Sequence, residues 1–248
     1  MRYSYFISSI ILFMFFPCCS STQTKRGTNP PVLEAGAIVT EDFVSANNLS
    51  CFFYSSEIDS SLFKRIKGKS YKEDCPIPVS ELRYIRALHI DAEGRIHIGE
   101  MICNQQISND IIDILQELFI VRYPIERMVL VDNYDADDDL SMEANNSSCF
   151  NYRTIAETDS ISMHGYGLAV DINTKFNPYV KTVKGVRRVW PATSEQYLRD
   201  RDNRTDIPYL IKKGDACYNA FIKRGFVWGG EWVSKKDYQH FEKHEQVR

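Results

Sequence analysis

The sequence predicts an α+β fold in which a small, mostly antiparallel sheet is flanked by helices. Strand-like apolar runs at residues 82–90 and 95–102 surround Asp91-Ala92-Glu93-Gly94, a pattern typical of a β-hairpin. Residues 108–123 place apolar side chains at helical spacing, which predicts an amphipathic helix. A local strand pair followed by a long helix favours an α+β domain.

The elements that follow the hairpin can be assigned in order. Ser108 is a candidate N-cap for the helix, and Pro124 marks the end of the helix. Residues 128–131 predict a further strand, because they form a short apolar run. The acidic stretch at residues 132–148 predicts a solvated polar loop.

Three shorter elements complete the domain. An apolar run at residues 169–172 predicts a buried strand. Residues 215–224 predict a short helix, and the alternating residues 238–242 predict a final strand. This last strand would bring Asp237 and His240 back toward His164.

Length and charge limit the class of protein. A chain of 248 residues with 44% hydrophobic residues can build one domain with a sizeable core beside a targeting segment. The formal net charge is −3, and the chain has no run rich in Lys and Arg. These features argue against a nucleic-acid partner.

The N-terminus predicts export. Met1-Arg2 precedes the apolar residues 7–16, which are too few to span a membrane but suit a signal peptide. Cys18 and Cys19 follow directly, so we expect a lipoprotein-type signal at residues 1–19 and a lipid anchor on one of the two thiols. Ordinary signal cleavage and a retained anchor are the alternatives. Either cysteine would hold the protein at the cell envelope.

A polar segment containing Gly27 and Pro30-Pro31 follows the signal. We expect a tether at residues 20–45 and a globular domain at residues 46–248. The cysteines beyond the signal are Cys51, Cys75, Cys103, Cys149 and Cys217. Disulfides are permitted in an exported chain, but their pairing stays open. Cys103 is expected to be a buried thiol.

Two motifs, far apart in the sequence, contain candidate metal ligands. Residues 162–171 have the pattern S-x-H-x-x-G-x-A-x-D, and D-x-x-H follows at residues 237–240. They supply His164, Asp171 and His240, two imidazoles and a carboxylate. Catalytic zinc sites use three such protein ligands and a water molecule. An isolated H-x6-D pair is common, whereas the complete pattern is specific. A metal is also the simplest partner for a carboxylate inside an apolar run.

Asp237 lies three residues before the last predicted ligand and remains as a candidate general base. The alternative is that Asp237 orients one of the metal ligands.

Other candidate metal sites are weaker. His89 and His97 could face each other across the hairpin, where hydrogen-bonded or exposed histidines are the simpler interpretation. His244 follows His240 at helical spacing, but the alternating pattern favours a solvated tail. The acidic residues 135–139 lack the glycine and glutamate of a calcium-binding EF-hand.

At these motifs the chain resembles the zinc peptidases that include VanY-like and VanX-like D-alanyl-D-alanine peptidases and phage endolysin L-alanyl-D-glutamate endopeptidases. The resemblance extends over roughly residues 80–243 and implies the hedgehog/DD-peptidase fold. It implies zinc on His164, Asp171 and His240, so that residues 46–248 would form a zinc peptidase domain. Asp237 stands where many D-Ala-D-Ala peptidases carry Glu, and the endolysin enzymes resemble the chain more closely there.

The resemblance also implies substrate contacts. Arg153 matches an upstream arginine that contacts substrate near the scissile bond, and residues 228–232 resemble a Gly/Trp segment that precedes the last ligand. Ser162, Tyr166 and Trp232 are expected to shape the site.

The implied activity is hydrolysis of peptidoglycan stem peptides by zinc-activated water, with Asp237 as the base. Either a D-Ala-D-Ala carboxypeptidase or an L-Ala-D-Glu endopeptidase would fit. A zinc-stabilised binding module of the cell envelope, without turnover, is the alternative from another class.

Overall fold

The computed structural model describes residues 33–155 and 158–244. The expected signal peptide, Cys18, Cys19 and residues 20–32 of the expected tether lie outside the described residues. No helix in the described part of the chain is both long enough and apolar enough to cross a membrane.

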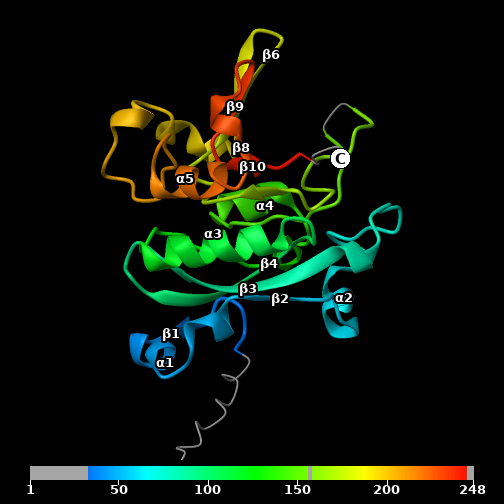
Figure 1. Cartoon of the computed structure of the whole chain (residues 1–248). Helices are drawn as coiled ribbons and strands as arrows, with labels where there is room; N and C mark the ends of the chain where they lie inside the picture. The colour runs from blue at the N-terminus through cyan, green and yellow to red at the C-terminus, as the bar shows by residue number, and fades with distance from the viewer. Residues whose placement is uncertain (1–32, 156–157, 245–248) are drawn as a thin grey trace, which may run out of the picture.

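A four-stranded antiparallel sheet forms the base of the fold (Figure 1). Its strands, in order, are β1 (Ile38–Val39), β4 (Ile96–Asn104), β3 (Leu82–Ile90) and β2 (Tyr54–Ser56). β3 and β4 are the predicted hairpin. The sheet therefore confirms the strongest local prediction from the sequence.

Two three-stranded antiparallel sheets lie on the other side of the molecule. One contains β5 (Ala169–Asp171), β10 (His240–Glu242) and β8 (Val227–Trp228). The other contains β7 (Val186–Trp190), β6 (Tyr179–Val183) and β9 (Lys235–Asp237). The α+β class is confirmed, although the strands form three small sheets rather than one.

The helices are short apart from one. They are α1 (Glu41–Ser45), α2 (Ser60–Ile66), α3 (Ser108–Ile120), α4 (Asp138–Glu143) and α5 (Ala216–Ile222). Single 3₁₀ turns lie at Leu49–Phe52, Val79–Glu81, Val131–Tyr134, Ala192–Tyr197, Arg201–Asn203 and Gly229–Glu231.

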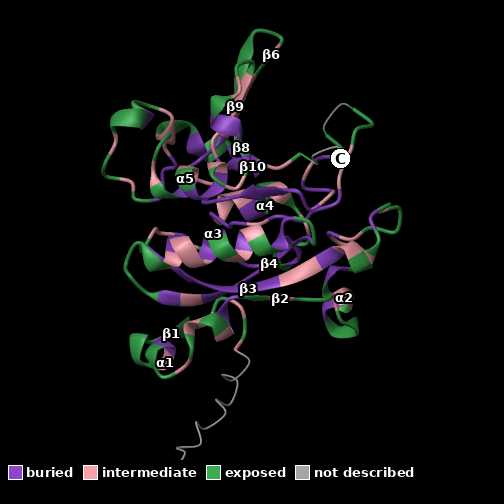
Figure 2. Ribbon diagram, viewed as in Figure 1, coloured by how far each residue is buried: buried purple, intermediate pink, exposed green. Residues whose placement is uncertain are grey.

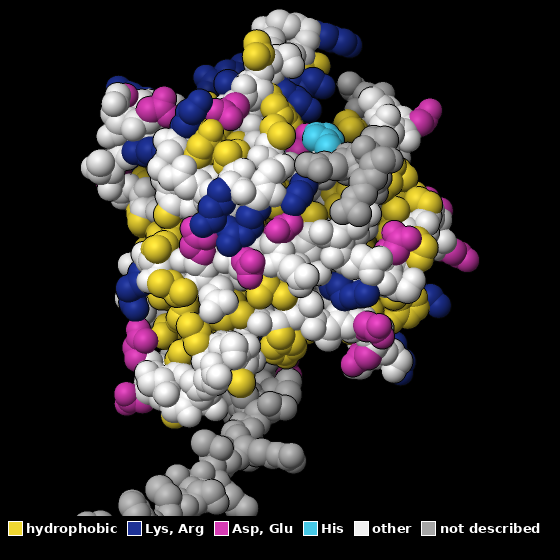
Figure 3. All heavy atoms as spheres, in the orientation of Figure 1, with side chains coloured by type: hydrophobic (Ala, Val, Ile, Leu, Met, Phe, Trp, Pro, Cys, Tyr) yellow, Lys and Arg dark blue, Asp and Glu magenta, His cyan; other side chains and the backbone are white. Residues whose placement is uncertain are grey.

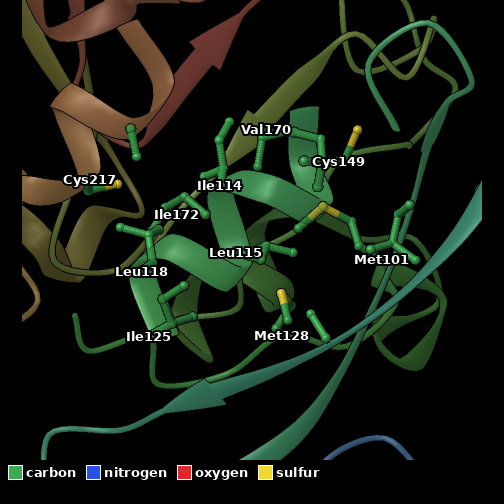
Figure 4. Packing of buried hydrophobic residues seen from close by; sticks show 14 of the residues in the cluster. Met101, Ile114, Leu115, Leu118, Ile125, Met128, Cys149, Val170, Ile172 and Cys217 are labelled. Carbon is green, nitrogen blue, oxygen red and sulfur yellow. The ribbon is translucent and has the colours of Figure 1, made fainter. Parts of the chain in front are cut away.

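Helix α3 is the central layer of the fold (Figure 4). Its buried side chains, among them Leu115 and Leu118, belong to the same core cluster as Met101 of β4. Val170 and Ile172, in and after β5, belong to this cluster too. The strand that ends at Asp171 is therefore anchored in the same core as α3. Figure 2 shows that β3 and β4 are largely buried, whereas no residue of β6 or β7 is buried.

The predicted helix differs from α3 at both ends. Ile107, rather than Ser108, is the N-cap residue, and no side chain caps the helix there. The Ser108 hydroxyl instead donates to the Gln105 carbonyl at 3.0 Å. The helix ends at Ile120 instead of Tyr123, because Arg122 adopts a left-handed conformation with φ of 55°.

The strand predicted at residues 128–131 is wrong. The Val129 backbone N–H and carbonyl are bound at 3.0 Å by the side-chain amide of buried Asn146, which takes the place of a neighbouring strand. The solvated loop predicted at residues 132–148 is also wrong in part. It contains a 3₁₀ turn and α4, and the side chain of Asp137 caps α4 by accepting from the Leu140 N–H at 3.0 Å.

The short C-terminal elements are confirmed with shifted ends. Asp215 caps α5 by accepting from the Tyr218 N–H at 2.7 Å. The final strand begins at His240 rather than at residue 238.

At the other end of the domain, residues 38–45 form β1 and α1, and β1 pairs with β4. The structured domain therefore begins before the expected boundary at residue 46.

Cysteines in the described part of the chain carry no disulfide; Cys51, Cys75, Cys103, Cys149 and Cys217 are all free thiols. Cys103 is fully buried, as predicted.

His89 and His97 face each other across the hairpin, as the sequence suggested. Their rings stack at 5.0 Å, and His97 Nε2 lies 2.7 Å from Asp91 Oδ2. His89 is buried, with Nδ1 donating to the Ile125 carbonyl at 2.7 Å. Both histidines are hydrogen-bonded within the fold, which supports the simpler interpretation.

A pH dependence of stability follows from His89. Burial is the main cause that lowers the pKa of His89 to about 4, below the value of about 6.5 in an unfolded chain. The unfolded state therefore binds more protons between these pH values, so stability is lost as the pH falls from about 6.5 to 4, by up to about 3 kcal/mol. His89→Asn keeps a donor near Nδ1 but cannot titrate. Urea unfolding across this pH range should show a smaller loss for the variant, and parallel curves would contradict the assignment.

Candidate metal centre

Strand pairing brings two predicted ligands together. His240 at the start of β10 lies directly opposite Asp171 at the end of β5. Side chains of directly opposed residues project from the same face within about 5.5 Å. The predicted strand at residues 238–242 and the apolar run that contains Asp171 therefore pair in a register that brings two predicted metal ligands together.

A tight turn presents His164 to this pair. The Ser162 hydroxyl accepts from the His164 backbone N–H at 3.3 Å, and the Ser162 carbonyl accepts from the Gly165 N–H at 2.7 Å. Gly167 has φ of 69°, and a Cβ there would lie 2.7 Å from the Asn104 nitrogen. The turn therefore docks against the end of β4 only because residue 167 has no side chain.

The three candidate ligand atoms converge. His164 Nε2 lies 3.1 Å from His240 Nδ1 and 3.2 Å from Asp171 Oδ1, and His240 Nδ1 lies 3.1 Å from Asp171 Oδ1. All three residues are buried.

Hydrogen bonds on the far side of each imidazole fix its tautomer. The Nδ1–H of His164 donates to the Cys149 carbonyl at 2.7 Å, and the Nε2–H of His240 donates to Glu242 Oε2 at 3.0 Å. The neutral rings therefore turn lone pairs toward each other and toward the Asp171 carboxylate. Three acceptors that face one another in a buried site require a positive charge between them.

The spacing of these atoms suits zinc. Ligand atoms about 2.0–2.1 Å from a tetrahedral zinc lie about 3.3 Å apart, and the observed separations are slightly shorter. In the absence of an ion a proton can supply the charge. Burial opposes this, but hydrogen bonds to Asp171 and Glu242 raise the pKa of His240 to about 10. The residues present therefore fit a metal ion.

Glu242 is a site residue that the sequence interpretation missed. Besides its bond to His240, its Oε1 lies 3.1 Å from Nε2 of His244, whose side chain is 63% exposed. The signal was present in the sequence, because H-x-E on a strand places both side chains on one face. His244 lies at the surface, in agreement with the solvated tail expected there.

Asp237 lies beside the ligands at the end of β9. Its Oδ1 is buried without a hydrogen-bond partner among the described residues. Burial is the main cause that raises the pKa of Asp237 to about 7. The charge of His240 opposes this shift, and the charges of Lys235 and Arg153 oppose it to a smaller extent. A Cβ on Gly229 would lie 2.6 Å from the Asp237 carbonyl and 3.3 Å from the His240 Cβ, so the missing side chain allows this close approach.

Arg153 reaches the site through the backbone. Its carbonyl accepts from the Ser162 N–H at 3.0 Å, which aligns residues 149–153 with the turn that carries His164. The guanidinium forms an ion pair with Asp138 at the start of α4, and the side chain is 35% exposed. The charge of Arg153 also helps to lower the pKa of Asp237, and its side chain is partly exposed.

The other predicted site residues have distinct places. Ser162 is buried, and its hydroxyl holds the turn. Tyr166 packs against both hydrophobic clusters of the domain. The Trp232 ring lies 5.3 Å from the His240 ring and is half-buried. Trp232 therefore forms part of the wall of the site, whereas Ser162 and Tyr166 support it from within.

Comparison with known families agrees with this site. Residues 156–243 match the model of a family described as D-alanyl-D-alanine carboxypeptidase. The match includes His164, Asp171, Asp237 and His240, and it confirms the family resemblance of this segment. The match supports a peptidase, and Arg153 lies just outside the matched residues. No curated protein and no solved structure matches the chain significantly.

The role of Glu242 can be tested through metal affinity. Glu242→Ala should weaken zinc binding by about 10–100-fold, because partners that orient a ligand histidine contribute that much. Glu242→Gln keeps an acceptor for the His240 N–H and should lose less. His244→Ala, which removes the exposed partner of Glu242, is the matched control. Competition with a chelator measures the affinities, and equal affinities in all four proteins would exclude an orienting role.

Proposed function

We propose that the protein is a zinc metallopeptidase that hydrolyses peptide bonds in peptidoglycan stem peptides. The bond would be that of a D-Ala-D-Ala carboxypeptidase or an L-Ala-D-Glu endopeptidase. One observation carries the proposal: three buried metal-ligating atoms lie 3.1–3.2 Å apart, beside a buried carboxylate oxygen that has no partner in the described structure.

His164, Asp171 and His240 would hold the zinc ion. When bound, zinc lowers the pKa of a coordinated water to about 7 and polarises the substrate carbonyl. Asp237 Oδ1 accepts the proton of the attacking water and returns it to the leaving amine. The Arg153 guanidinium, half-exposed near Asp237, stabilises the developing oxyanion or holds a substrate carboxylate.

The unpartnered oxygen of Asp237 favours an enzyme over a binding module. A buried carboxylate oxygen without a donor costs free energy. A purely structural metal site has no use for such a group, whereas a general base must keep its oxygen available for a water proton.

We also propose export to the cell envelope, with a lipid on Cys18 or Cys19 and no nucleic-acid partner. The support is the N-terminal sequence pattern and the formal net charge of −3. Such a location would place the enzyme beside its substrate.

The activity is tested by mass spectrometry of purified peptidoglycan after digestion, with and without a chelator. Zinc-dependent loss of a terminal alanine would establish a carboxypeptidase. Release of peptides that begin with D-Glu would establish an endopeptidase. A zinc-loaded protein that leaves walls of several bacterial types intact would overturn the proposal in favour of a binding module.

Two substitutions separate metal binding from proton transfer. His164→Ala should abolish zinc binding and hydrolysis together, because two ligands remain. Asp237→Asn should keep stoichiometric zinc and lower kcat by about 10²–10⁴-fold, the usual contribution of a general base. Zinc content is measured by elemental analysis of the same samples used for kinetics. Wild-type turnover by Asp237→Asn would exclude Asp237 as the base.

A further inference from the structure

One face of the β7-β6-β9 sheet carries Asp237, two aromatic residues and a row of cations. Asp237 lies opposite Tyr179, and Tyr179 lies opposite Trp190. Directly opposed residues share a face, and alternate residues of a strand return to that face. The next positions on this face are occupied by three cations, Lys235, Lys181 and Arg188, which are paired in the same register. We call these three residues the cation row.

The cation row is costly for the fold. Like charges directly opposite each other on neighbouring strands destabilise a sheet. Among the described residues, no carboxylate lies within ion-pair distance of any of the three cations, whereas Arg187 on the opposite face lies 3.9 Å from Glu195. Figure 3 shows several dark blue side chains around the β6–β7 hairpin at the top of the view. An uncompensated row of this kind is suited to bind an anion.

Lys235 connects the cation row to the metal centre. Its Nζ lies 4.4 Å from the centre of the Trp232 ring and 5.9 Å from that of Tyr179. The Trp232 ring in turn lies 5.3 Å from the ring of His240. The neighbouring Lys236 points the other way and donates to the Gly230 carbonyl at 3.0 Å. Aromatic faces therefore hold one ammonium group beside the catalytic centre without neutralising its charge.

The far end of the cation row is less suited to an anion. Arg188 and Trp190 line a pocket against α4 that also contains Asp139 and Glu143. These carboxylates form no ion pair with Arg188, but they lower the positive potential on this side of the pocket. The anion site therefore lies at the Lys235 and Lys181 end, next to Asp237.

We propose that Lys235 and Lys181 bind a free carboxylate on the substrate residue that follows the scissile bond. This inference rests on the proposed function. Both candidate bonds meet the requirement, because a terminal D-Ala has a free carboxylate and a D-Glu linked through its side chain keeps a free α-carboxylate. Charge-assisted hydrogen bonds from ammonium groups would anchor this carboxylate. Such an anchor positions the scissile carbonyl near the metal and Asp237.

The experiment compares acids with amides. One pair is the stem pentapeptide with a terminal D-Ala carboxylate or carboxamide, and the other contains D-Glu or D-isoglutamine. Lys235→Met should raise KM for the acid of the cleaved pair by about 10–100-fold, the value of a hydrogen bond to a charged group. Its effect on the amide should be small. Lys181→Met should have the same selectivity.

Two further variants control for charge and for folding. Lys235→Arg keeps the positive charge and should preserve the preference for the acid. Arg187→Met removes one charge from the opposite face of the same hairpin, where an exposed ion pair contributes little, and should leave both substrates unaffected. Equal losses on acid and amide, or no loss in Lys235→Met, would overturn the proposal.

Failure of the proposed function would be recognised separately. If the wild-type protein cleaves neither pair, binding of the same peptides to the zinc-loaded protein is measured by calorimetry. Tighter binding of the acids that disappears in Lys235→Met would support carboxylate recognition without turnover. Equal binding of acids and amides would refute it.

Discussion

The convergence of three acceptor atoms is the constraint on which the rest of the site depends. Nε2 of His164, Nδ1 of His240 and Oδ1 of Asp171 face one another at 3.1–3.2 Å inside the protein. The Cys149 carbonyl and the Glu242 carboxylate fix the two ring tautomers from behind. Pairing of β5 with β10 and packing of β5 on α3 hold these groups in place. The fold thus holds three buried acceptor atoms together, and this arrangement is stable only when a cation lies between them.

The sequence contains the information for the ligands, because their geometry follows from local rules. A glycine-containing turn before a buried strand presents His164 and Asp171 together, and alternation on the last strand presents His240. The same alternation predicts that Glu242 shares a face with His240. The residues 128–131 fail as a predicted strand because the amide of Asn146, distant in sequence, bonds the backbone of Val129.

The cation row could not be derived from the sequence in the same way. It depends on the register between β6 and β9, which are separated by more than fifty residues. Alternate residues of strand β9 point to the same face of the sheet. Lys235 and Asp237 share one face, and Lys236 between them is bonded to the Gly230 carbonyl. In the proposed mechanism, substrate recognition and proton transfer would therefore lie on one short strand.

The ligands Asp171 and His240 are 69 residues apart in the chain. The segment between them contains the whole β7-β6-β9 sheet, Trp232 and one wall of the pocket against α4, residues 188–192. An ion bound by both residues closes this segment into a loop, and closing a loop of that length removes conformational freedom from the unfolded chain. The bound ion would thus stabilise the segment that carries the proposed substrate-binding surface. Metal availability would then set how well the substrate surface is ordered as well as how fast bonds are cut.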